Sequence, residues 1–362
     1  MIKLRDICTV VSGTTPKSNK PEYWDGNINW VTPAELTDDS DVIFESQRKI
    51  TEKAIVDCSL KPFPAGTVLL SSRAPIGKVA IAGVEMYCNQ GFKNLICSDK
   101  IYNRYLYYYL KYKTDYLNSL GRGATFKEIS KSIVENIEIP LPPLDEQRKI
   151  AAMLDKVSDL IAKHRQQLDK LDELVKSRFI EMFGDPITNS MKLPTEQMDK
   201  RYFLKAGLTT AAEDIHAYSE GSYEIPCYGG NGIRGYVEEK SYEGEYPIIG
   251  RQGALCGNVQ FASGRFHATE HAVLVSLLKG DNTVWTYHML KLMDLYRYHT
   301  GAAQPGLAVK TLNTVDVIVA DISRQNQFAS FVKQVDKSKL AIKQSLEKLE
   351  TLRKSLMQHY FG

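Results

Sequence analysis

The stretch from Gln147 to Gly184 reads QRKIAAMLDKVSDLIAKHRQQLDKLDELVKSRFIEMFG, with no proline and with no glycine before its last residue. Its seam residues recur in alternating steps of four and three, which is the heptad repeat of a helix that packs along one side, here over roughly five heptads. Pro142 and Pro143 precede it, and Gly184 is followed by Asp185 and Pro186, so both helix ends are predicted. Such a helix extends roughly 55 Å and needs a partner helix.

A matching stretch lies at the other end of the chain. Residues Gln325 to Gly362 read QNQFASFVKQVDKSKLAIKQSLEKLETLRKSLMQHYFG, and a shift of 178 positions, from Gln147 to Gln325, aligns the two stretches without a gap. The same shift pairs residues 137–139 with residues 315–317 upstream of the helices. A repeat close to half the chain length indicates a tandem duplication.

The duplication predicts an α+β architecture of two mixed α/β globular heads and two long helices that form an antiparallel coiled coil with pseudo-twofold symmetry. The predicted boundaries are residues 1–143 for the first head, 144–184 for the first long helix, 185–321 for the second head and 322–362 for the second long helix. The helices match better than the heads do, which indicates that the heads perform similar tasks on different targets.

Bulk composition excludes several classes of protein. The chain has 362 residues, 43% hydrophobic residues and a net charge of +3, which is too small to indicate nucleic-acid binding by itself. The six cysteines form no CxxC pair and no zinc-site spacing, and no signal peptide or apolar run of about 18 residues is present. We therefore expect a cytoplasmic protein with reduced thiols, no bound cofactor or metal and no membrane partner.

Several motifs carry a resemblance to a known family. They are the run Pro140–Gln147 before the first long helix, its end at Met182–Pro186, and the segments Ser71–Gly77, Asn89–Gly91, Ile249–Ala254 and Gly301–Gly306. On these motifs the chain resembles the specificity (S) subunit of type I restriction–modification enzymes over essentially its whole length. The resemblance implies a target-recognition domain in each head, each reading one half of a bipartite double-stranded DNA site, with the long helices setting the spacing.

The same resemblance implies a subunit without chemistry of its own, which guides methylation subunits and, through them, restriction subunits. From the pseudo-twofold symmetry we expect two copies of the methylation subunit to dock on the basic residues outside the helix seam. Because the two heads differ, the predicted DNA site is asymmetric.

Readers of DNA use forked donors for guanine, amides for adenine and cations for phosphate. The candidate DNA-binding residues are Arg73, Lys78, Asn89, Gln90, Lys93, Arg122 and Lys127 in the first head, and Asn231, Arg234, Arg251, Gln252, Asn258, Thr269, His271 and Gln304 in the second. Arg73 and Arg251 stand 178 positions apart, so both heads retain an arginine at this turn. The alternative for each of these two is a structural arginine that braces the turn.

Other patterns favour structural interpretations. Gly230–Gly235 matches G-x-G-x-x-G, but turn and strand signals follow it where a dinucleotide site needs a helix. His267 and His271 lack the glutamate of a zinc motif, and the tyrosines from Tyr105 to Tyr116 fit a helix core better than base stacking. The chain also lacks the aromatic-ending Asn/Asp-Pro-Pro motif of a DNA methyltransferase and a P-loop, which argues against a stand-alone enzyme. A coiled-coil scaffold without a DNA role would leave the turn-rich heads unexplained.

Overall fold

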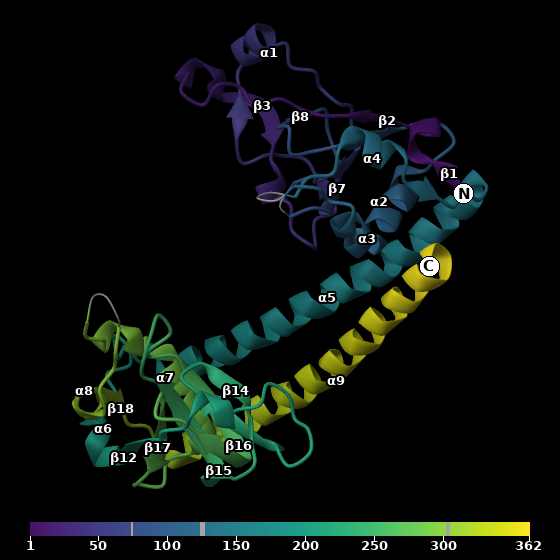
Figure 1. The fold of residues 1–362 in the computed structure, drawn as a ribbon. Helices are drawn as coiled ribbons and strands as arrows, with labels where there is room; N and C mark the ends of the chain where they lie inside the picture. Colours follow the sequence, from purple (N-terminus) through teal and green to yellow (C-terminus); the bar gives the residue numbers. More distant parts are fainter. Residues whose placement is uncertain (74, 124–126, 302–304) are drawn as a thin grey trace. The chain divides into compact units, whose positions relative to one another are not determined.

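The computed structural model describes residues 1–73, 75–123, 127–301 and 305–362, and it divides into two compact units (Figure 1). The first unit contains residues 1–164 and 345–362, and the second contains residues 165–344. Each unit therefore combines one globular part with a segment of each long helix. We call the part of the first unit before the long helix α5 the first head, and the part of the second unit between α5 and α9 the second head.

Short strands, most of them antiparallel, build the first head. A five-stranded sheet has the order β2-β9-β6-β7-β4, a three-stranded sheet has the order β5-β3-β8, and β1 pairs with β10. The helix α2 packs against β7 of the larger sheet, and the inner strands β6 and β7 are apolar and completely buried. The strands are β1 (Ile2–Lys3), β2 (Cys8–Val11), β3 (Trp24–Val31), β4 (Val42–Ile43), β5 (Lys49–Ile50), β6 (Val68–Leu70), β7 (Val79–Ala82), β8 (Tyr87–Cys88), β9 (Asn94–Cys97) and β10 (Glu138–Ile139). The helices are α1 (Glu52–Cys58), α2 (Asn103–Tyr112), α3 (Thr114–Ser119) and α4 (Lys131–Glu135), with short 3-10 turns at Leu4–Asp6, Pro21–Tyr23 and Pro33–Glu35.

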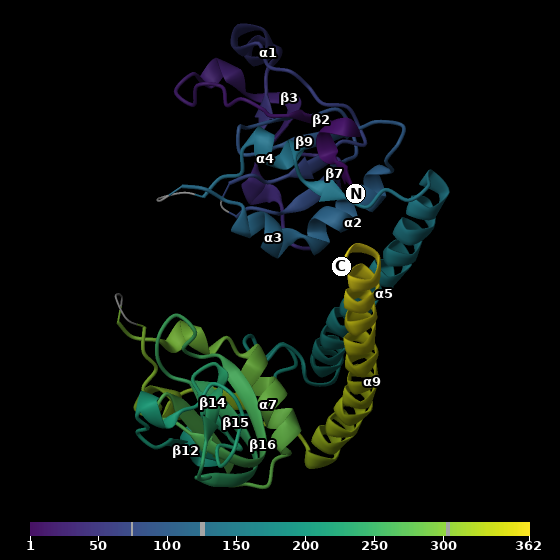
Figure 2. The same cartoon turned by 45° about the vertical axis from the view of Figure 1, so that its right-hand side comes forward.

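The second head is organised around one six-stranded sheet of order β12-β17-β15-β16-β13-β14, and a separate pair joins β11 to β18. The helix α7 packs on β15 and β16 (Figure 2), and it begins where the Asn282 side chain accepts hydrogen bonds from the first turn. The strands are β11 (Thr195–Gln197), β12 (Tyr202–Ala206), β13 (Ile225–Gly229), β14 (Gly232–Val237), β15 (Tyr242–Gly250), β16 (Val259–Ala268), β17 (Ala272–Leu277) and β18 (Asp316–Ile318). The helices are α6 (Met198–Arg201), α7 (Thr283–Leu292) and α8 (Val309–Asn313), with 3-10 turns at Ala212–Asp214 and Leu295–Tyr298.

The two predicted long helices are confirmed as α5 (Leu144–Phe183) and α9 (Ile322–Phe361). Their segments run antiparallel within each unit. In the first unit His164 Nε2 lies 3.1 Å from Ser345 Oγ. In the second unit Phe179 packs edge-on against Phe328 at 5.3 Å between ring centroids. The helix α5 stops at Gly184, which adopts a φ of +75° and where a Cβ atom would lie 2.6 Å from Ser190 Oγ.

One aromatic side chain anchors the C-terminal end of each long helix in a core. Phe361 of α9 is 2% exposed and lies 5.3 Å and 5.8 Å, between ring centroids, from Tyr105 and Tyr109 of the first head. Phe183 of α5 is fully buried in the second unit, 5.7 Å from the ring of Trp285. Each unit therefore contains the start of one long helix and the end of the other, as a duplicated chain with antiparallel helices requires.

A buried glutamine joins the start of each long helix to its head. Gln147 Oε1 accepts a hydrogen bond of 2.8 Å from the backbone N–H of Tyr102, directly before α2. Gln325 Oε1 accepts a hydrogen bond of 2.8 Å from the backbone N–H of Asn282, directly before α7. Both glutamines are at most 1% exposed, so these bonds are shielded from water. The same device appears in both halves, which supports the duplication predicted from the sequence.

The register of the repeat shifts inside the heads, which the gap-free alignment of the helices does not reveal. In the first head Leu70 of β6 pairs with Val79 of β7, and in the second Ile249 of β15 pairs with Val259 of β16. The offset is therefore 179 between the first strands of these pairs and 180 between the second strands. It returns to 178 before the long helices, because single-residue insertions in the loops are compensated further along the chain.

Candidate nucleic-acid interface

In the first head, three candidate residues converge on Glu128, two on its carboxylate and one on its backbone. The Nε atom of Arg73 lies 2.9 Å from Glu128 Oε2, and the Nζ atom of Lys93 lies 3.2 Å from Glu128 Oε1. Arg122 exchanges backbone hydrogen bonds of 3.0 Å and 2.9 Å with Glu128. Burial alone would raise the pKa of Glu128, but the hydrogen bonds from Arg73 and Lys93 outweigh it and lower the pKa below its ordinary range. The carboxylate is thus held ionised between two cations.

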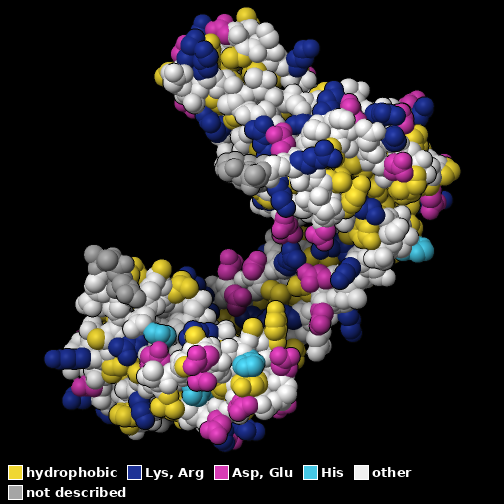
Figure 3. All heavy atoms as spheres, viewed as in Figure 1, with side chains coloured by type: hydrophobic (Ala, Val, Ile, Leu, Met, Phe, Trp, Pro, Cys, Tyr) yellow, Lys and Arg dark blue, Asp and Glu magenta, His cyan; other side chains and the backbone are white. Residues whose placement is uncertain are grey.

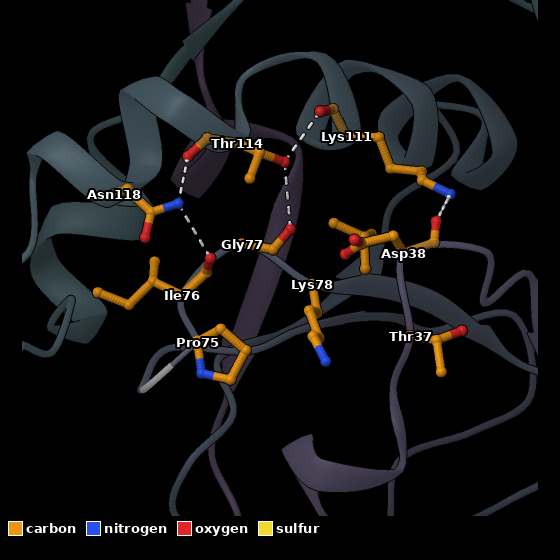
Figure 4. A pocket seen from close by; sticks show the side chains of 10 residues that line it. Thr37, Asp38, Pro75, Ile76, Gly77, Lys78, Lys111, Thr114 and Asn118 are labelled. Carbon is orange, nitrogen blue, oxygen red and sulfur yellow. Dashed lines mark hydrogen bonds between the residues drawn. The ribbon is translucent and has the colours of Figure 1, made fainter. Parts of the chain in front are cut away.

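The helix α3 braces the turn after Arg73, beside a hollow of about 390 Å³ (Figure 4). Thr114 Oγ1 donates to the carbonyl of Gly77 at 3.3 Å, and Asn118 Nδ2 donates to the carbonyl of Ile76 at 3.2 Å. Gly77 adopts a φ of +91°, and a Cβ atom there would lie 3.0 Å from the Thr114 methyl group, so only glycine fits without strain. Lys78 is committed to the same structure, because its Nζ donates to the carbonyl of Leu36 at 2.6 Å.

The remaining candidates of the first head differ in exposure. Asn89 accepts a hydrogen bond of 2.9 Å from the N–H of Gly91 and thereby shapes its own turn. Gln90 accepts a bond from the Thr15 hydroxyl at 2.5 Å. Lys127 is exposed, whereas Lys93 is buried. A backbone bond of 2.8 Å from Ser72 N–H to the carbonyl of Gly91 joins the Arg73 turn to this segment.

In the second head, the structure brings the described candidates together at one end of the large sheet. The N–H of Arg251 donates to the carbonyl of His271 at 3.0 Å, and the N–H of Thr269 donates to the carbonyl of Tyr228 on β13 at 2.9 Å. The Asn258 amide donates to the side-chain oxygen of Asn231. Gln252 is exposed beside Arg251, Arg234 packs near Gly229 at the same hairpin, and Gln304 lies outside the described residues.

Three of these side chains bury polar atoms that have no hydrogen-bond partner among the described residues: Arg251 Nε, Thr269 Oγ1 and His271 Nδ1. Thr269 is fully buried, and the other ring nitrogen of His271 lies 3.2 Å from Glu270 Oε1. A buried donor without a partner costs roughly 1–3 kcal/mol. The three atoms are enclosed by the protein, so the cluster marks incomplete internal hydrogen bonding beside Arg251.

The sequence register of 178 had placed Arg73 opposite Arg251, and the structure corrects this pairing. Arg73 forms a β-bridge with Glu128, and the residue that forms the matching bridge with Gly306 is Gln252. Glu128 and Gly306 are themselves 178 positions apart, but one extra residue before the turn moves Arg251 back by one place. Gln252 is therefore the structural counterpart of Arg73.

Glu128 is not among the candidates predicted from the sequence, although it contacts both Arg73 and Lys93. A lone carboxylate in a loop carries no local signal, because its partners Arg73 and Lys93 are distant in sequence. One sequence feature could have indicated Glu128: it aligns with Gly306 in the second half, so one half has a charged side chain where the other has a glycine.

Bulk charge does not identify the interface. On the face shown in Figure 3, Lys and Arg side chains are interspersed with Asp and Glu and form no continuous basic patch. Because unspecific attraction to DNA grows with the number of unneutralised cations, this surface favours recognition by individual side chains.

The comparison with protein families decides the identity of the chain. A family model described as the type I restriction modification DNA specificity domain matches residues 1–173 and 205–351. The chain belongs to this family. The specificity subunit of the type I restriction enzyme EcoprrI from Escherichia coli is 34% identical over 354 residues, covering 92% of this chain and 87% of the relative. The MjaIX specificity subunit of Methanocaldococcus jannaschii is 42% identical over 203 residues, covering 55% and 47% respectively.

Solved structures of specificity subunits share the fold. A crystal structure of the S subunit from M. genitalium has a TM-score of 0.64 at 17% identity, covering 100% of this chain and 95% of that one. A chain from a study of complex assembly and conformational transition of the type I R-M system has a TM-score of 0.60 at 15% identity, covering 99% and 96%. The predicted α+β heads and coiled-coil helices are thereby confirmed, and the chain is a DNA specificity subunit of the type I family.

The patterns set aside in the sequence are structural in the specificity subunit. Gly229–Gly232 is the turn between strands β13 and β14, so no helix follows the glycines. The tyrosines Tyr105 and Tyr107–Tyr109 are buried in the core of the first unit, while Tyr116 is exposed. No cluster of three or more His, Cys, Asp or Glu side chains suited to a metal ion occurs in the ranges that the structure describes. The described helices include none that is long and apolar enough to cross a bilayer.

Proposed function

We propose that this specificity subunit reads a bipartite, asymmetric DNA site, with one half-site for each head, and directs partner subunits to it. The observation that supports this most directly is a shared backbone framework with different side chains. The bridges Arg73–Glu128 and Gln252–Gly306 occupy the same place in the two heads, yet one pair is charged and the other is neutral. Two readers with one framework and different side chains recognise two different sequences.

Most of the side chains proposed to contact DNA are exposed or have an unpaired polar atom; Asn258, which bonds Asn231, and Gln304, which lies outside the described residues, are proposed from the sequence. In the first head the proposed side chains are Arg73, Gln90, Arg122 and Lys127, with Asn89 shaping the turn between them. In the second head they are Asn231, Arg234, Arg251, Gln252, Asn258, Thr269, His271 and Gln304. Lys78 and Lys93 have their ammonium groups committed to Leu36 and Glu128, and we propose that they hold the loops in position.

We further propose that the long helices form the docking surface for two methylation subunits, through which restriction subunits join the complex in the cytoplasm. Methylation and cleavage would then belong to the partners, and the chain itself would need no cofactor. Basic side chains outside the helix seam supply the surface, and they are exposed: Arg148, Lys149, Lys163, Lys170 and Lys176 on α5, and Lys333, Lys343, Lys348 and Lys354 on α9.

Mapping of methylated bases by long-read sequencing tests the proposal. The genome of a host that carries the complete system is compared with the genome of the same host without this gene. The expected result is the loss of one methylated motif that has two different halves separated by a fixed gap. Loss of a continuous motif, or an unchanged methylation pattern in a host whose methylation subunit is active, would contradict the proposal. Native mass spectrometry of the purified complex tests the expected two methylation subunits for each specificity subunit.

A further inference from the structure

The counterpart positions of Arg73 and Gln252 carry a specific prediction about the bases that the heads read. Arg73 follows β6 after two residues, Gln252 follows β15 after one residue, and both form a β-bridge to the same place in the framework. Both side chains are exposed. Arginine and glutamine are also the side chains whose fork-shaped groups match the major-groove edges of guanine and adenine, respectively.

The geometry at Arg73 favours a base edge over a phosphate. Glu128 holds the Nε atom of Arg73 at 2.9 Å, and within the described part of the chain the two terminal nitrogens of the guanidinium have no partner. This leaves two parallel donors in a fixed orientation, which is the arrangement that pairs with O6 and N7 of guanine. Glu128 also offsets the charge of Arg73, which weakens attraction to a phosphate.

The surroundings of Gln252 also favour contact with a base edge over contact with a phosphate. Its amide is neutral, so it adds no attraction to the DNA backbone. A glutamine amide has one donor and one acceptor side, which match N7 and the N6 amino group of adenine. Its bridge partner is Gly306, which has no side chain. A carboxylate at this place would have no guanidinium to orient.

We propose, on the basis of the DNA-reading function above, that this shared position reads one purine in each half-site: guanine through Arg73 and adenine through Gln252. Glu128 is a positioning residue for Arg73. The heads thus differ in specificity at this place through two residue differences. Arg73 in the first head corresponds to Gln252 in the second, and Glu128 corresponds to Gly306.

The first test replaces Arg73 by glutamine in the complete complex and maps methylation in the host. We expect one position of the first half-site to change from guanine to adenine or to lose its preference, while the second half-site stays unchanged. A bidentate contact discriminates by about 5- to 150-fold, so the preference for guanine at that position should fall at least fivefold. Arg5→Gln is the matched control, because Arg5 is in the same head and its side chain is 54% exposed, against 46% for Arg73.

The second test transfers the arrangement to the other head through the double variant Gln252→Arg, Gly306→Glu. A Cβ atom on Gly306 would meet nothing closer than 3.9 Å, so the glutamate has room. We expect one adenine of the second half-site to become guanine. Gln252→Arg without the glutamate should give a weaker preference for guanine, because the guanidinium then lacks its support.

The variant Glu128→Gln tests positioning. It should reduce discrimination only at the base read by Arg73, whereas a purely structural role would lower methylation at all sites equally. If a variant complex methylates too weakly to map, the purified complex is titrated with duplexes substituted at each position, together with Arg73→Lys, which keeps the ion pair but loses the fork.

The outcomes separate this inference from the proposed function. If Arg73→Gln and Arg5→Gln leave the same motif, or if Arg73→Gln weakens binding to all sequences equally and reduces its salt dependence, the base-reading role is wrong. If the complex with the Arg5→Gln control and the unmodified complex both methylate no split motif, the proposed function itself fails.

Discussion

Replacement of Phe361 by alanine tests how the end of α9 holds the first unit together. Phe361 is 2% exposed, and its ring lies edge-on to Tyr105 at 5.3 Å and to Tyr109 at 5.8 Å between centroids. Truncation of a buried phenylalanine costs about 3–5 kcal/mol, and each edge-to-face pair contributes roughly 0.5–1.5 kcal/mol beyond its buried area. Because domains are stable by only about 5–15 kcal/mol, the loss is a large fraction of the total.

Hydrogen exchange followed by mass spectrometry measures this loss separately in each unit. A destabilisation of about 3 kcal/mol accelerates exchange by roughly 150-fold for amides that exchange through unfolding of the whole unit. We expect this acceleration for amides of α2 and of the central strands β6 and β9. Amides of the second unit should keep their rates, because Phe361 belongs to the core of the first unit.

Two further variants make the result decisive. Leu352→Ala on the same segment of α9 removes a side chain that is 47% exposed, and it should change stability by less than about 0.5 kcal/mol. Phe183→Ala removes the corresponding anchor of α5 and should destabilise the second unit instead. The assignment of each helix end to one core would be refuted if Phe361→Ala accelerated exchange equally in both units, or by less than fivefold in the first.

Three other predictions concern single positions. Gly257→Ala should destabilise the second head by more than about 2 kcal/mol in denaturant titration, because φ is +83° and a Cβ atom would lie 2.4 Å from the backbone nitrogen of Tyr296; an effect below 1 kcal/mol would contradict the geometry. Burial lowers the pKa of His288 to about 3, so below pH 6.5 the histidine takes up a proton in the unfolded chain but not in the folded one. The second unit should therefore lose up to about 1.4 kcal/mol of stability for each pH unit between 6.5 and 3. His288→Leu should flatten this slope relative to the unmodified chain. Glu128→Gly should destabilise the first head by about 1–3 kcal/mol because the buried Lys93 ammonium loses its carboxylate partner and keeps the Ser72 hydroxyl at 3.3 Å, and the additional change Lys93→Val should recover most of the loss in a double-mutant cycle.

The long helices were predictable because every signal for them is local. Heptad spacing, the prolines before α5 and Gly184 after it act within a few residues, and the structure places α5 at Leu144–Phe183 accordingly. The heads were predictable only as a fold class. Their strands are as short as two residues, and the partners of a strand such as β6 are set by contacts with distant parts of the chain.

The site illustrates the same limit at the level of single side chains. Side-chain type and position in a turn placed Arg73 and Gln252 among the candidates, and both side chains are exposed in the structure. The relation between them was not predictable, because it depends on an offset of 179 that only strand pairing reveals. The role of Glu128 was not predictable either, since a carboxylate is assigned to a cation by proximity in space.

The ion pair of Lys93 and Glu128 next to Arg73 explains how one backbone framework can carry Arg73 in one head and Gln252 in the other. Lys93 donates its backbone N–H to Leu70, and the residue that pairs with Ile249 at the matching place in the second head is Val273. The second head thus lacks both the buried cation and the carboxylate. Removing one member of a buried pair leaves an uncompensated charge, whereas replacing both members together by apolar or small residues is often neutral in stability. The backbone bridges at Glu128 and Gly306 need no side chain, so they persist through such an exchange. A head can therefore change from a charged to a neutral reader while its fold stays the same, and this separation of framework from reader allows two halves of one duplicated chain to recognise different sequences.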